Sequence, residues 1–210
     1  MFTTLFREVE AVGANTYLKD GERQILESAV VGIAGAGGLG SNCAMHLVRA
    51  GVKKFVIADF DVVSESNLNR QFFFRDQLGR KKVDALAENL RRIEPKLELD
   101  MRDVKLSPEN IDWTFSGCSV IVEAFDSAEA KAMLLHAVLP LGKRVVAASG
   151  LAGWGRSAQI TQRRIGKDLI LIGDTTSDIR SGLAPVSPRV GIAAAMQANA
   201  VCALLLGEEL

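Results

Sequence analysis

Cysteine and histidine are scarce in this chain of 210 residues, which has three of the first and two of the second. The cysteines, Cys43, Cys118 and Cys202, lie far apart, and no C-x-x-C pair occurs, which excludes a zinc ribbon and a dithiol redox motif. Cys43 and Cys202 stand among apolar residues of expected helices, so we interpret them as small buried hydrophobes. His46 and His136 also fall inside helical patterns. The sequence therefore offers no Ser/His/Asp or Cys/His catalytic set.

An excess of charge is also missing, because 25 basic residues balance 25 acidic ones. A net charge of zero gives no reason to expect nucleic acid or a membrane surface as the main partner. The apolar stretches are interrupted before the roughly 18 residues needed to span a bilayer, and the N-terminus MFTTLFREVE has no basic region followed by a long apolar core, as a secretory signal would. We therefore expect a cytoplasmic protein. With 48% hydrophobic residues, residues 1–210 fit a single α/β domain that begins with an arm over 1–20.

Glycine is well represented, and its spacing over residues 31–41, VGIAGAGGLGS, is the most informative feature. Gly35-x-Gly37-x-x-Gly40 follows an apolar run and precedes a helical pattern. In such a strand–turn–helix unit, the first glycine permits the tight turn, the second lets the backbone approach a phosphate, and the third lets the helix pack close to the strand. The free N–H groups at the start of the helix also favour an anion. The motif predicts a nucleotide-binding βαβ unit, and the alternative is a turn that merely packs helix on strand.

Strand-like and helix-like segments alternate over the first 150 residues. We expect strands at 29–34, 54–58, 97–101, 119–124 and 144–148, and helices at 21–27, 39–50, 81–93, from Ser107-Pro108 onward, and at 127–139. This alternation predicts a parallel sheet wound with helices on both faces. The pattern then changes to two strand-like runs, 156–164 and 167–172, joined as an antiparallel hairpin, and an Ala-rich helix over 188–206. The fold class is α/β, a Rossmann-like doubly wound sheet with antiparallel C-terminal strands.

Ligands of open α/β sheets bind beyond the carboxyl ends of the strands, where this chain places several polar residues. Asp59 is positioned to accept hydrogen bonds from ribose hydroxyls, and Asp61 is a second polar contact or assists at a metal. Arg70 offers a planar fork to phosphate oxygens and Lys82 a point charge. Asp126 provides a hard oxygen ligand suited to Mg²⁺. Together they indicate a nucleoside triphosphate whose α-phosphate is attacked.

Each of these residues also has a structural interpretation. Lys82 by itself fits a solvated helix position, Arg70 a brace within an Asn-rich loop, and Asp126 a cap on the following helix. The aromatic run Phe72–Phe74 is more typical of core or dimer packing than of base stacking. Because the three charged residues follow the appropriate strands, we favour the phosphate site when they are taken jointly.

The same residues resemble the ThiF/MoeB family, the bacterial relatives of ubiquitin-activating enzymes, over residues 20–206. The matching motifs are Gly35–Ser41, Asp59-Phe60-Asp61, Ser66-Asn67-Leu68-Asn69-Arg70-Gln71, Lys82, Asp126 and Pro188-Arg189-Val190-Gly191. The Asn-Leu-Asn-Arg-Gln block is much more specific than the glycines. Within the family, the chain is most similar to the short, zinc-free branch that adenylates the sulfur carrier protein ThiS.

The resemblance implies that the protein binds ATP and Mg²⁺ and adenylates the C-terminal Gly-Gly carboxylate of a ubiquitin-like sulfur carrier, as in thiamine biosynthesis. It also implies a homodimer. The implied nucleotide site comprises Gly35, Gly37, Gly38, Gly40, Ser41, Asp59, Asp61, Asn67, Asn69, Arg70, Gln71 and Lys82, with Arg70, Lys82 and Asp126 catalytic and Asp126 on the metal. A carboxylate nucleophile is already ionised at pH 7, so the reaction needs no general base.

The sequence departs from the family pattern in three respects. Longer members hold zinc with two C-x-x-C pairs that are absent here, so we expect no metal other than Mg²⁺. Some members carry a cysteine after the hairpin, whereas residues 173–187 have none, so we expect adenylation only, with sulfur from another protein. The family's N-terminal arginine, which reaches the partner subunit's ATP, matches poorly, and Arg7 or Arg23 is its candidate.

Three other functions remain open from sequence. Within the same class, the acceptor is a small carboxylate or a modified tRNA nucleoside, although the neutral charge disfavours tRNA. An NAD-dependent oxidoreductase uses the same glycine motif, but Arg70, Lys82 and the lack of an acid/base pair speak against it. A binding module that senses nucleotide without turnover is the third.

Overall fold

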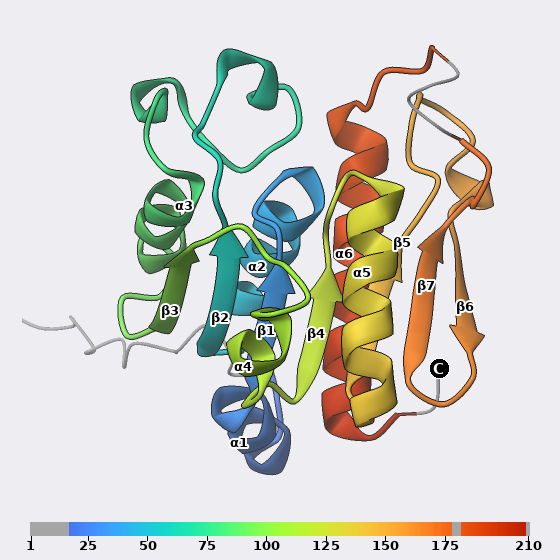
Figure 1. The fold of residues 1–210 in the computed structure, drawn as a ribbon. Helices are drawn as coiled ribbons and strands as arrows, with labels where there is room; N and C mark the ends of the chain where they lie inside the picture. Colours follow the sequence, from blue (N-terminus) through green and yellow to red (C-terminus); the bar gives the residue numbers. More distant parts are fainter. Residues whose placement is uncertain (1–16, 178–181, 209–210) are drawn as a thin grey trace, which may run out of the picture.

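The computed structural model describes residues 17–177 and 182–208. They form one seven-stranded sheet with helices on both faces (Figure 1). The strands are β1 (Val30–Ala34), β2 (Lys54–Asp59), β3 (Glu98–Asp103), β4 (Val120–Glu123), β5 (Arg144–Ala148), β6 (Thr161–Ile165) and β7 (Leu169–Gly173). The helices are α1 (Asp20–Ser28), α2 (Gly38–Ala50), α3 (Lys82–Arg91), α4 (Ile111–Phe115), α5 (Ala128–Val138) and α6 (Ser187–Leu206).

The strand order is β3-β2-β1-β4-β5-β7-β6. All neighbouring pairs are parallel except β6 and β7, which are antiparallel. The predicted fold class is therefore confirmed, including the C-terminal hairpin. Because β1 is followed by β2 on one side and paired with β4 on the other, the strand order reverses at β1, and this is where such sheets open a ligand crevice.

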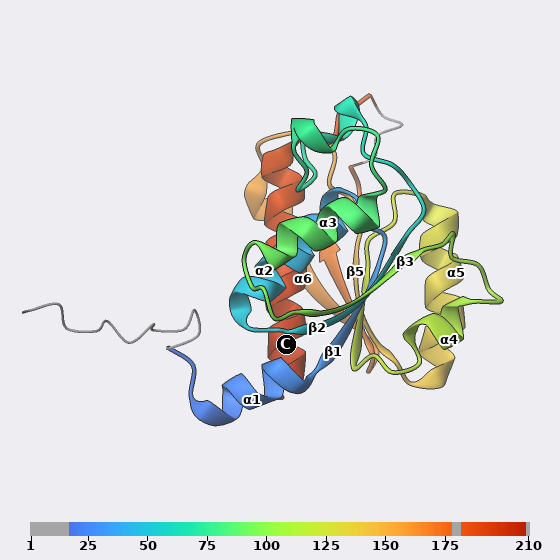
Figure 2. The ribbon, with the colours of Figure 1, turned by 90° about the vertical axis from the view of Figure 1, so that its left-hand side faces the viewer.

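Two apolar layers flank the sheet, with α2, α3 and α6 on one face and α4 and α5 on the other (Figure 2). Successive side chains along a strand point to opposite faces of the sheet, so each strand contributes residues to both layers. On β4, Val120 and Val122 pack with the first layer and Ile121 with the second. Such two-sided burial explains why the central strands are almost wholly apolar in sequence.

Helix α6 corrects the expectation that every apolar stretch is too short to span a bilayer. It has 20 residues and, by length and composition alone, is apolar enough to do so. In the structure it packs against α2 and the sheet, and its buried Val190, Ala193, Ala194, Ala198, Ala200 and Val201 belong to the core. The buried amide nitrogen of Gln197 is satisfied, because Nε2 donates to Glu123 O and Val146 O. Its apolar character is therefore that of a core helix.

The two helical cysteines also belong to the core. Cys43 is fully buried in α2, and Cys202 packs against the same cluster from α6. Burial raises the pKa of both thiols, so neither has the thiolate character that a reactive cysteine needs. The prediction of a small buried hydrophobe is confirmed for Cys43, whereas Cys202 is partly buried.

Two local boundaries differ from the expected ones by four or five residues, and the others by no more than two. The short helix opened by Ser107-Pro108 in the prediction begins only at Ile111, because Asn110 Oδ1 first accepts the Ser107 N–H at 2.9 Å and closes a turn ahead of it. The strand expected from residue 156 begins at Thr161, because Arg156 has a left-handed backbone and leads into a 3-10 turn.

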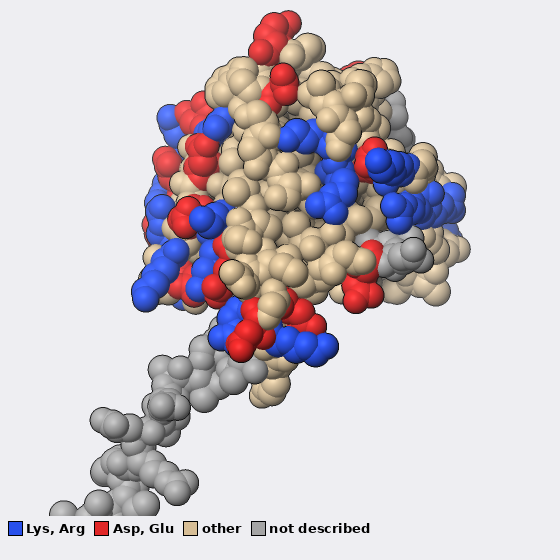
Figure 3. Space-filling view, turned by 90° about the horizontal axis from the view of Figure 1, so that it is seen from below, with Lys and Arg blue, Asp and Glu red and all other residues tan. Residues whose placement is uncertain are grey.

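The face at the amino ends of the strands carries charged side chains of both signs around a broad area that has neither (Figure 3). Several of these charges form ion pairs, such as Lys54 Nζ with Glu98 Oε1 at 3.1 Å and Lys53 Nζ with Glu27 Oε1 at 3.1 Å. Mixed charge of this kind does not create the single-sign field that binds nucleic acid.

Candidate active site

A cleft of about 890 Å³ lies at the carboxyl ends of β1, β2, β4 and β5. Its walls bring together most of the residues predicted from sequence. Those that line it are Gly35, Gly37, Gly38, Asp59, Asp61, Arg70, Gln71, Lys82 and Asp126. Residues separated by up to 91 positions in the chain thus meet in one place.

The three motif glycines have the distinct roles that the spacing predicts. Gly35 has φ +102, and a Cβ there would come within 2.9 Å of Ala124 O. A Cβ on Gly40 would stand 1.8 Å from Gly35 O, so this glycine allows α2 to pack directly on the turn. At Gly37, by contrast, a Cβ would meet only Gln71 Nε2 at 3.8 Å. The open space beside Gly37 lies on the cleft side, where a ligand can approach the backbone.

Asp59 joins the glycine turn to the end of β2. Its Oδ2 accepts the Ala36 N–H at 2.6 Å, and its Oδ1 accepts the Asp61 N–H at 2.8 Å. A carboxylate has about four acceptor sites, so two remain for a ligand in the cleft. The side chain therefore both fixes the turn and retains the capacity to accept hydroxyl groups.

Lys82 is the buried cation of the cleft. Its side chain is 7% exposed, and Nζ lies 2.7 Å from Asp61 Oδ2, whereas the Asp61 side chain is 51% exposed. An ammonium has three donors, so Lys82 can donate to a ligand while it keeps Asp61. The sequence predicted both residues at the site but not that they pair with each other.

Arg70 lies at the other side of the glycine loop, against Gly38. Its Nη1 donates to Ser66 O at 3.1 Å and to Asn69 Oδ1 at 2.8 Å. Its carbonyl accepts Asn42 Nδ2 from α2 at 2.8 Å. The brace that we weighed as an alternative is therefore real, and Arg70 also lines the cleft, so its role as a phosphate contact stays a prediction.

A buried pair of amides ties the Arg70 loop to the helix that carries Lys82. Gln77 and Asn89 exchange hydrogen bonds of 2.8 and 3.0 Å, and Asn89 Nδ2 also donates to Phe72 O at 2.8 Å. Phe73 is buried beneath this loop, Phe72 packs against the core, and Phe74 is exposed. The aromatic run thus contributes core packing, and dimer packing stays a prediction.

Four predicted nucleotide-site residues do not line the cleft. These are Gly40, Ser41, Asn67 and Asn69. The Ser41 hydroxyl donates to Gly37 O at 2.6 Å and accepts the Phe72 N–H, and the Asn67 side chain accepts the Ser64 N–H. They shape the loops that hold the cleft, and their direct contact with nucleotide stays a prediction.

Asp126 extends into the cleft from the end of β4. The cap of α5 is not Asp126 but Ser127, whose hydroxyl accepts the Ala130 N–H at 3.1 Å. No group of three metal-binding side chains occurs among the residues that the structure describes. Mg²⁺ is commonly held by one or two carboxylates together with substrate phosphates, so one exposed carboxylate fits a metal that arrives with its nucleotide.

Sequence reasoning missed an apolar wall and a buried ion pair of the cleft. The wall is lined by Phe60, Val104, Leu106, Phe125 and Met133. Only the position of Phe60, between the two aspartates of its motif, could have indicated from sequence that an apolar residue belongs to the cleft. Beneath the cleft, fully buried Glu123 on β4 is held by Lys131 Nζ at 3.0 Å to both carboxylate oxygens.

The buried carboxyl of Glu123 leads to a prediction about how folding stability depends on pH. Burial raises the pKa of its carboxyl above 4.5, and the Lys131 ammonium offsets this only in part. Its contribution to stability is therefore fully present below pH 4.5 and is lost as the pH rises through the raised pKa. Glu123→Gln removes this loss, so the Tm of the variant minus that of the wild type increases from pH 4 to pH 8.

Thermal unfolding of both proteins across that range checks the prediction. Glu98→Gln, at an exposed carboxylate, serves as the control and is expected to show no such trend. A difference in Tm that stays constant with pH would mean that Glu123 has an ordinary pKa.

Of the two candidate arginines for the partner subunit's nucleotide, Arg23 does not line the cleft of this chain. Arg23 lies on α1, pairs with Asp20 at 2.6 Å and is close to Lys54 at the amino end of β2. Arg7 lies outside the described residues. A role for either in a dimer stays a prediction.

The arrangement is suited to binding and polarising a polyanion. The cleft is lined by the glycine loop, by the cations Arg70, Lys82, Lys105 and Lys131 and by the carboxylates Asp59, Asp61, Asp126 and Glu129, and among the described residues that line it there is no Cys or His. Groups of this kind can position a polyanion and stabilise its charge.

Comparisons with known proteins agree with this geometry. A model of the ThiF family matches residues 11–210. The adenylyltransferase and sulfurtransferase UBA4 of Candida glabrata is 33% identical over 142 residues, which are 67% of this chain and 33% of that protein. The tRNA threonylcarbamoyladenosine dehydratase of Escherichia coli K12 is 34% identical over 114 residues, which are 53% of this chain and 42% of that protein. The chain thus spans about a third of the length of the UBA4 relatives.

Solved structures share the fold. The E. coli tRNA N6-threonylcarbamoyladenosine dehydratase TcdA, in complex with ATP, superposes with a TM-score of 0.84 at 21% identity over 93% of both chains. E. coli MccB with ATP has a TM-score of 0.68 at 18% identity and covers 88% of this chain and 58% of its own.

Proposed function

Because the chain belongs to the ThiF family, we propose that it is an ATP-dependent adenylyltransferase that activates a carboxylate. The observation that carries this proposal is the meeting of Arg70, Lys82 and Asp126 with the glycine loop in one cleft. A dinucleotide cofactor needs only the loop and Asp59, whereas a triphosphate needs the two cations as well. We therefore set the oxidoreductase aside.

In this proposal the ribose hydroxyls bind the free acceptor sites of Asp59, and the base contacts the apolar wall that includes Phe60. The phosphates follow the glycine loop, with Arg70 and Lys82 donating to them. The acceptor carboxylate attacks the α-phosphorus, an acyl C–O–P bond forms, the bond between the α- and β-phosphates breaks, and diphosphate leaves. Asp126 would hold Mg²⁺, which when bound neutralises charge on the phosphates.

For the acceptor we propose the C-terminal Gly-Gly carboxylate of a ubiquitin-like sulfur carrier, as in the ThiS branch. Support comes from the family motifs and from the identity with proteins named adenylyltransferase and sulfurtransferase. The cleft lining, with no Cys among its described residues, supports adenylation without a protein-bound sulfur. Zinc is not part of the proposal.

A modified tRNA nucleoside is the second candidate acceptor. It is favoured by the identity with the E. coli tRNA threonylcarbamoyladenosine dehydratase. The zero net charge argues against it, because RNA-binding surfaces are strongly basic.

Diphosphate exchange tests the proposal and separates the two acceptors. The full chain is incubated with ATP, Mg²⁺ and labelled diphosphate, together with a ThiS-like carrier that ends in Gly-Gly. We expect label to enter ATP only with the intact carrier and not with one that lacks its last glycine. Exchange that requires threonylcarbamoyladenosine-containing tRNA instead would replace the carrier with the nucleoside, and no exchange with either would overturn adenylation.

A further inference from the structure

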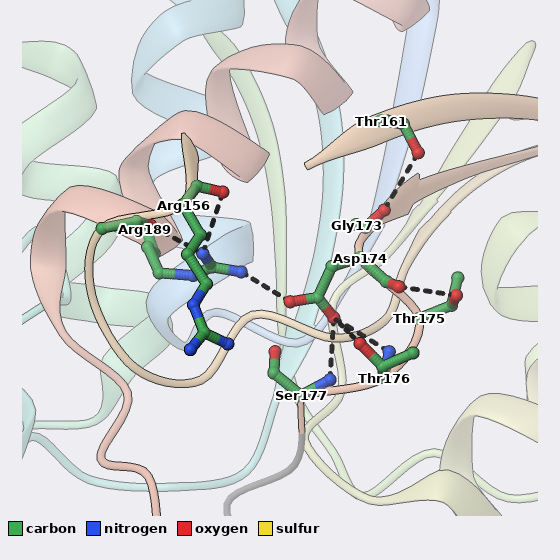
Figure 4. A network of polar contacts seen from close by, with 9 residues as sticks. Arg156, Thr161, Gly173, Asp174, Thr175, Thr176, Ser177 and Arg189 are labelled. Atoms are coloured by element: carbon green, nitrogen blue, oxygen red, sulfur yellow. Dashed lines mark hydrogen bonds and ion pairs between the residues drawn. The ribbon is translucent and has the colours of Figure 1, made fainter. Parts of the chain in front are cut away.

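A buried ion pair stands beside the cleft and is not explained by nucleotide binding. Asp174, directly after β7, and Arg189, in the first turn of α6, approach to 2.6 Å between Oδ2 and Nη2 (Figure 4). Their side chains are only 7% and 3% exposed. Removing two charges from water is costly unless their remaining donors and acceptors are also satisfied. Arg189 Nε has no partner within the described part of the chain, but the other polar atoms of the two side chains do, and these partners indicate what the pair does.

The pair connects three segments that are distant in sequence. Arg189 Nη1 donates to Gly155 O at 2.7 Å and to Arg156 O at 3.3 Å, in the loop after β5. Asp174 Oδ1 accepts the N–H groups of Thr176 at 2.9 Å and Ser177 at 2.8 Å, in the loop after β7. The start of α6 thus holds both loops through one guanidinium and one carboxylate.

Both loops contain backbone that requires such support. Thr175 has φ +60 and Arg156 has φ +49, a left-handed conformation that is unfavourable for residues other than glycine. The loops also interlock, because a Cβ on Gly150 would stand 2.1 Å from Asp174 Oδ1 and 2.4 Å from Thr175 N. Strained residues persist only where neighbouring contacts fix them, and the ion pair provides these contacts.

The two loops form one end of the cleft. Ser149–Ala152 and Thr175–Ser177 line it on the side of β5 and β7. The glycine loop and Asp59 lie on the side of β1 and β2, with Asp126 between the two sides in the strand order. A nucleotide bound as proposed occupies the β1–β2 side, and the end near β5 and β7 remains for the acceptor.

We propose that Asp174 and Arg189 are positioning residues that hold the acceptor end of the cleft in shape. The proposal rests on the adenylation proposed above. The ion pair touches neither substrate. It fixes Thr175–Ser177 and Ser149–Ala152 so that the chain bearing the carboxylate enters along a preformed wall.

Kinetics of the Asp174→Asn and Arg189→Lys variants test the proposal. We expect the KM for the carrier to rise about 10-fold or more in Asp174→Asn and by less in Arg189→Lys, which keeps the charge but loses the fork. The KM for ATP is expected to stay within about twofold, since an effect confined to the acceptor end leaves nucleotide binding intact. Lys54→Met, which removes an ion pair at the amino ends of the strands, is the matched control and is expected to change neither KM.

A second measurement does not depend on activity. Trp154 lies next to Gly155, whose carbonyl accepts Arg189, and the chain has only two tryptophans. In a Trp113→Phe background, time-resolved fluorescence anisotropy of Trp154 is expected to show more nanosecond motion in Asp174→Asn than in Lys54→Met.

The outcomes distinguish the two proposals. Greater motion of Trp154 together with a raised carrier KM supports the positioning role. If the wild-type protein shows no exchange, adenylation fails, and the anisotropy alone still decides whether the pair holds the loop. Unchanged motion, or KM values for ATP and carrier that rise by the same factor, would overturn the positioning role.

Discussion

Replacing Arg70 or Asp126 with alanine is expected to lower carrier-dependent diphosphate exchange by a factor of about 100 or more in each case. Groups that stabilise charge on a transferring phosphoryl group contribute on this scale, because the site offers them already oriented and partly shielded from water. Arg70 and Asp126 both line the cleft, where we propose that Arg70 binds the phosphates and Asp126 holds the metal. Initial rates of exchange at saturating ATP measure the effect.

A matched control comes from the same loop. Like Arg70, Arg75 contacts a side chain nearby, because its Nη1 lies 3.5 Å from Glu65 Oε1. Unlike Arg70, its side chain is 80% exposed and it does not line the cleft. Arg75→Ala should therefore retain exchange within about twofold, as surface substitutions usually have small effects. Arg70 also braces its loop, so Arg70→Ala removes both the charge and the brace. Arg70→Lys keeps the positive charge, and thermal unfolding of both variants shows whether the loop is disturbed. Retained exchange in both Arg70→Ala and Asp126→Ala would remove the site assignment.

The second prediction concerns two glycines three residues apart that should fail in different ways. A methyl group on Gly40 would stand 1.8 Å from Gly35 O, so Gly40→Ala must displace either the turn or α2. We expect this overpacking to cost about 3 kcal/mol of folding stability. A methyl group on Gly37 would meet only Gln71 Nε2, at an ordinary contact distance of 3.8 Å, so Gly37→Ala should change stability by no more than about 0.5 kcal/mol.

Nucleotide affinity should show the opposite contrast. The methyl group at position 37 extends into the space where a phosphate would approach, so Gly37→Ala is expected to weaken ATP binding by about 10-fold or more while the protein stays folded. Urea unfolding and isothermal titration of ATP into both variants measure the two effects. A Gly37→Ala protein that binds ATP normally would show that the phosphates do not follow this loop.

Much of the fold could be predicted because its determinants are local. Apolar runs and the change from strand–helix alternation to a hairpin are properties of neighbouring residues, and the observed order of elements follows them. The boundary errors at Ser107 and Arg156 arose where a side chain or a strained residue overrides local preference. Such positions depend on contacts that a propensity does not include.

In the candidate site too, some features could be predicted from sequence and others could not. Arg70, Lys82 and Asp126 could be assigned because each follows a strand whose end lies at the same edge of the sheet. The pairing of Lys82 with Asp61, however, could not be predicted from either residue by itself, nor could the burial of Glu123 beside Lys131. Asp174 was not singled out at all, although Arg189 stood in a family motif.

The sequence by itself determined the sheet class, the glycine turn and most of the residues that line the cleft, since strand periodicity and turn conformation are set within a few positions. Only the tertiary structure decided which charges neutralise one another and which loops share a support. The physical reason is that an ion pair such as Asp174–Arg189 gains its energy from burial and from several partners at once, and these exist only after β5, β7 and α6 have come together.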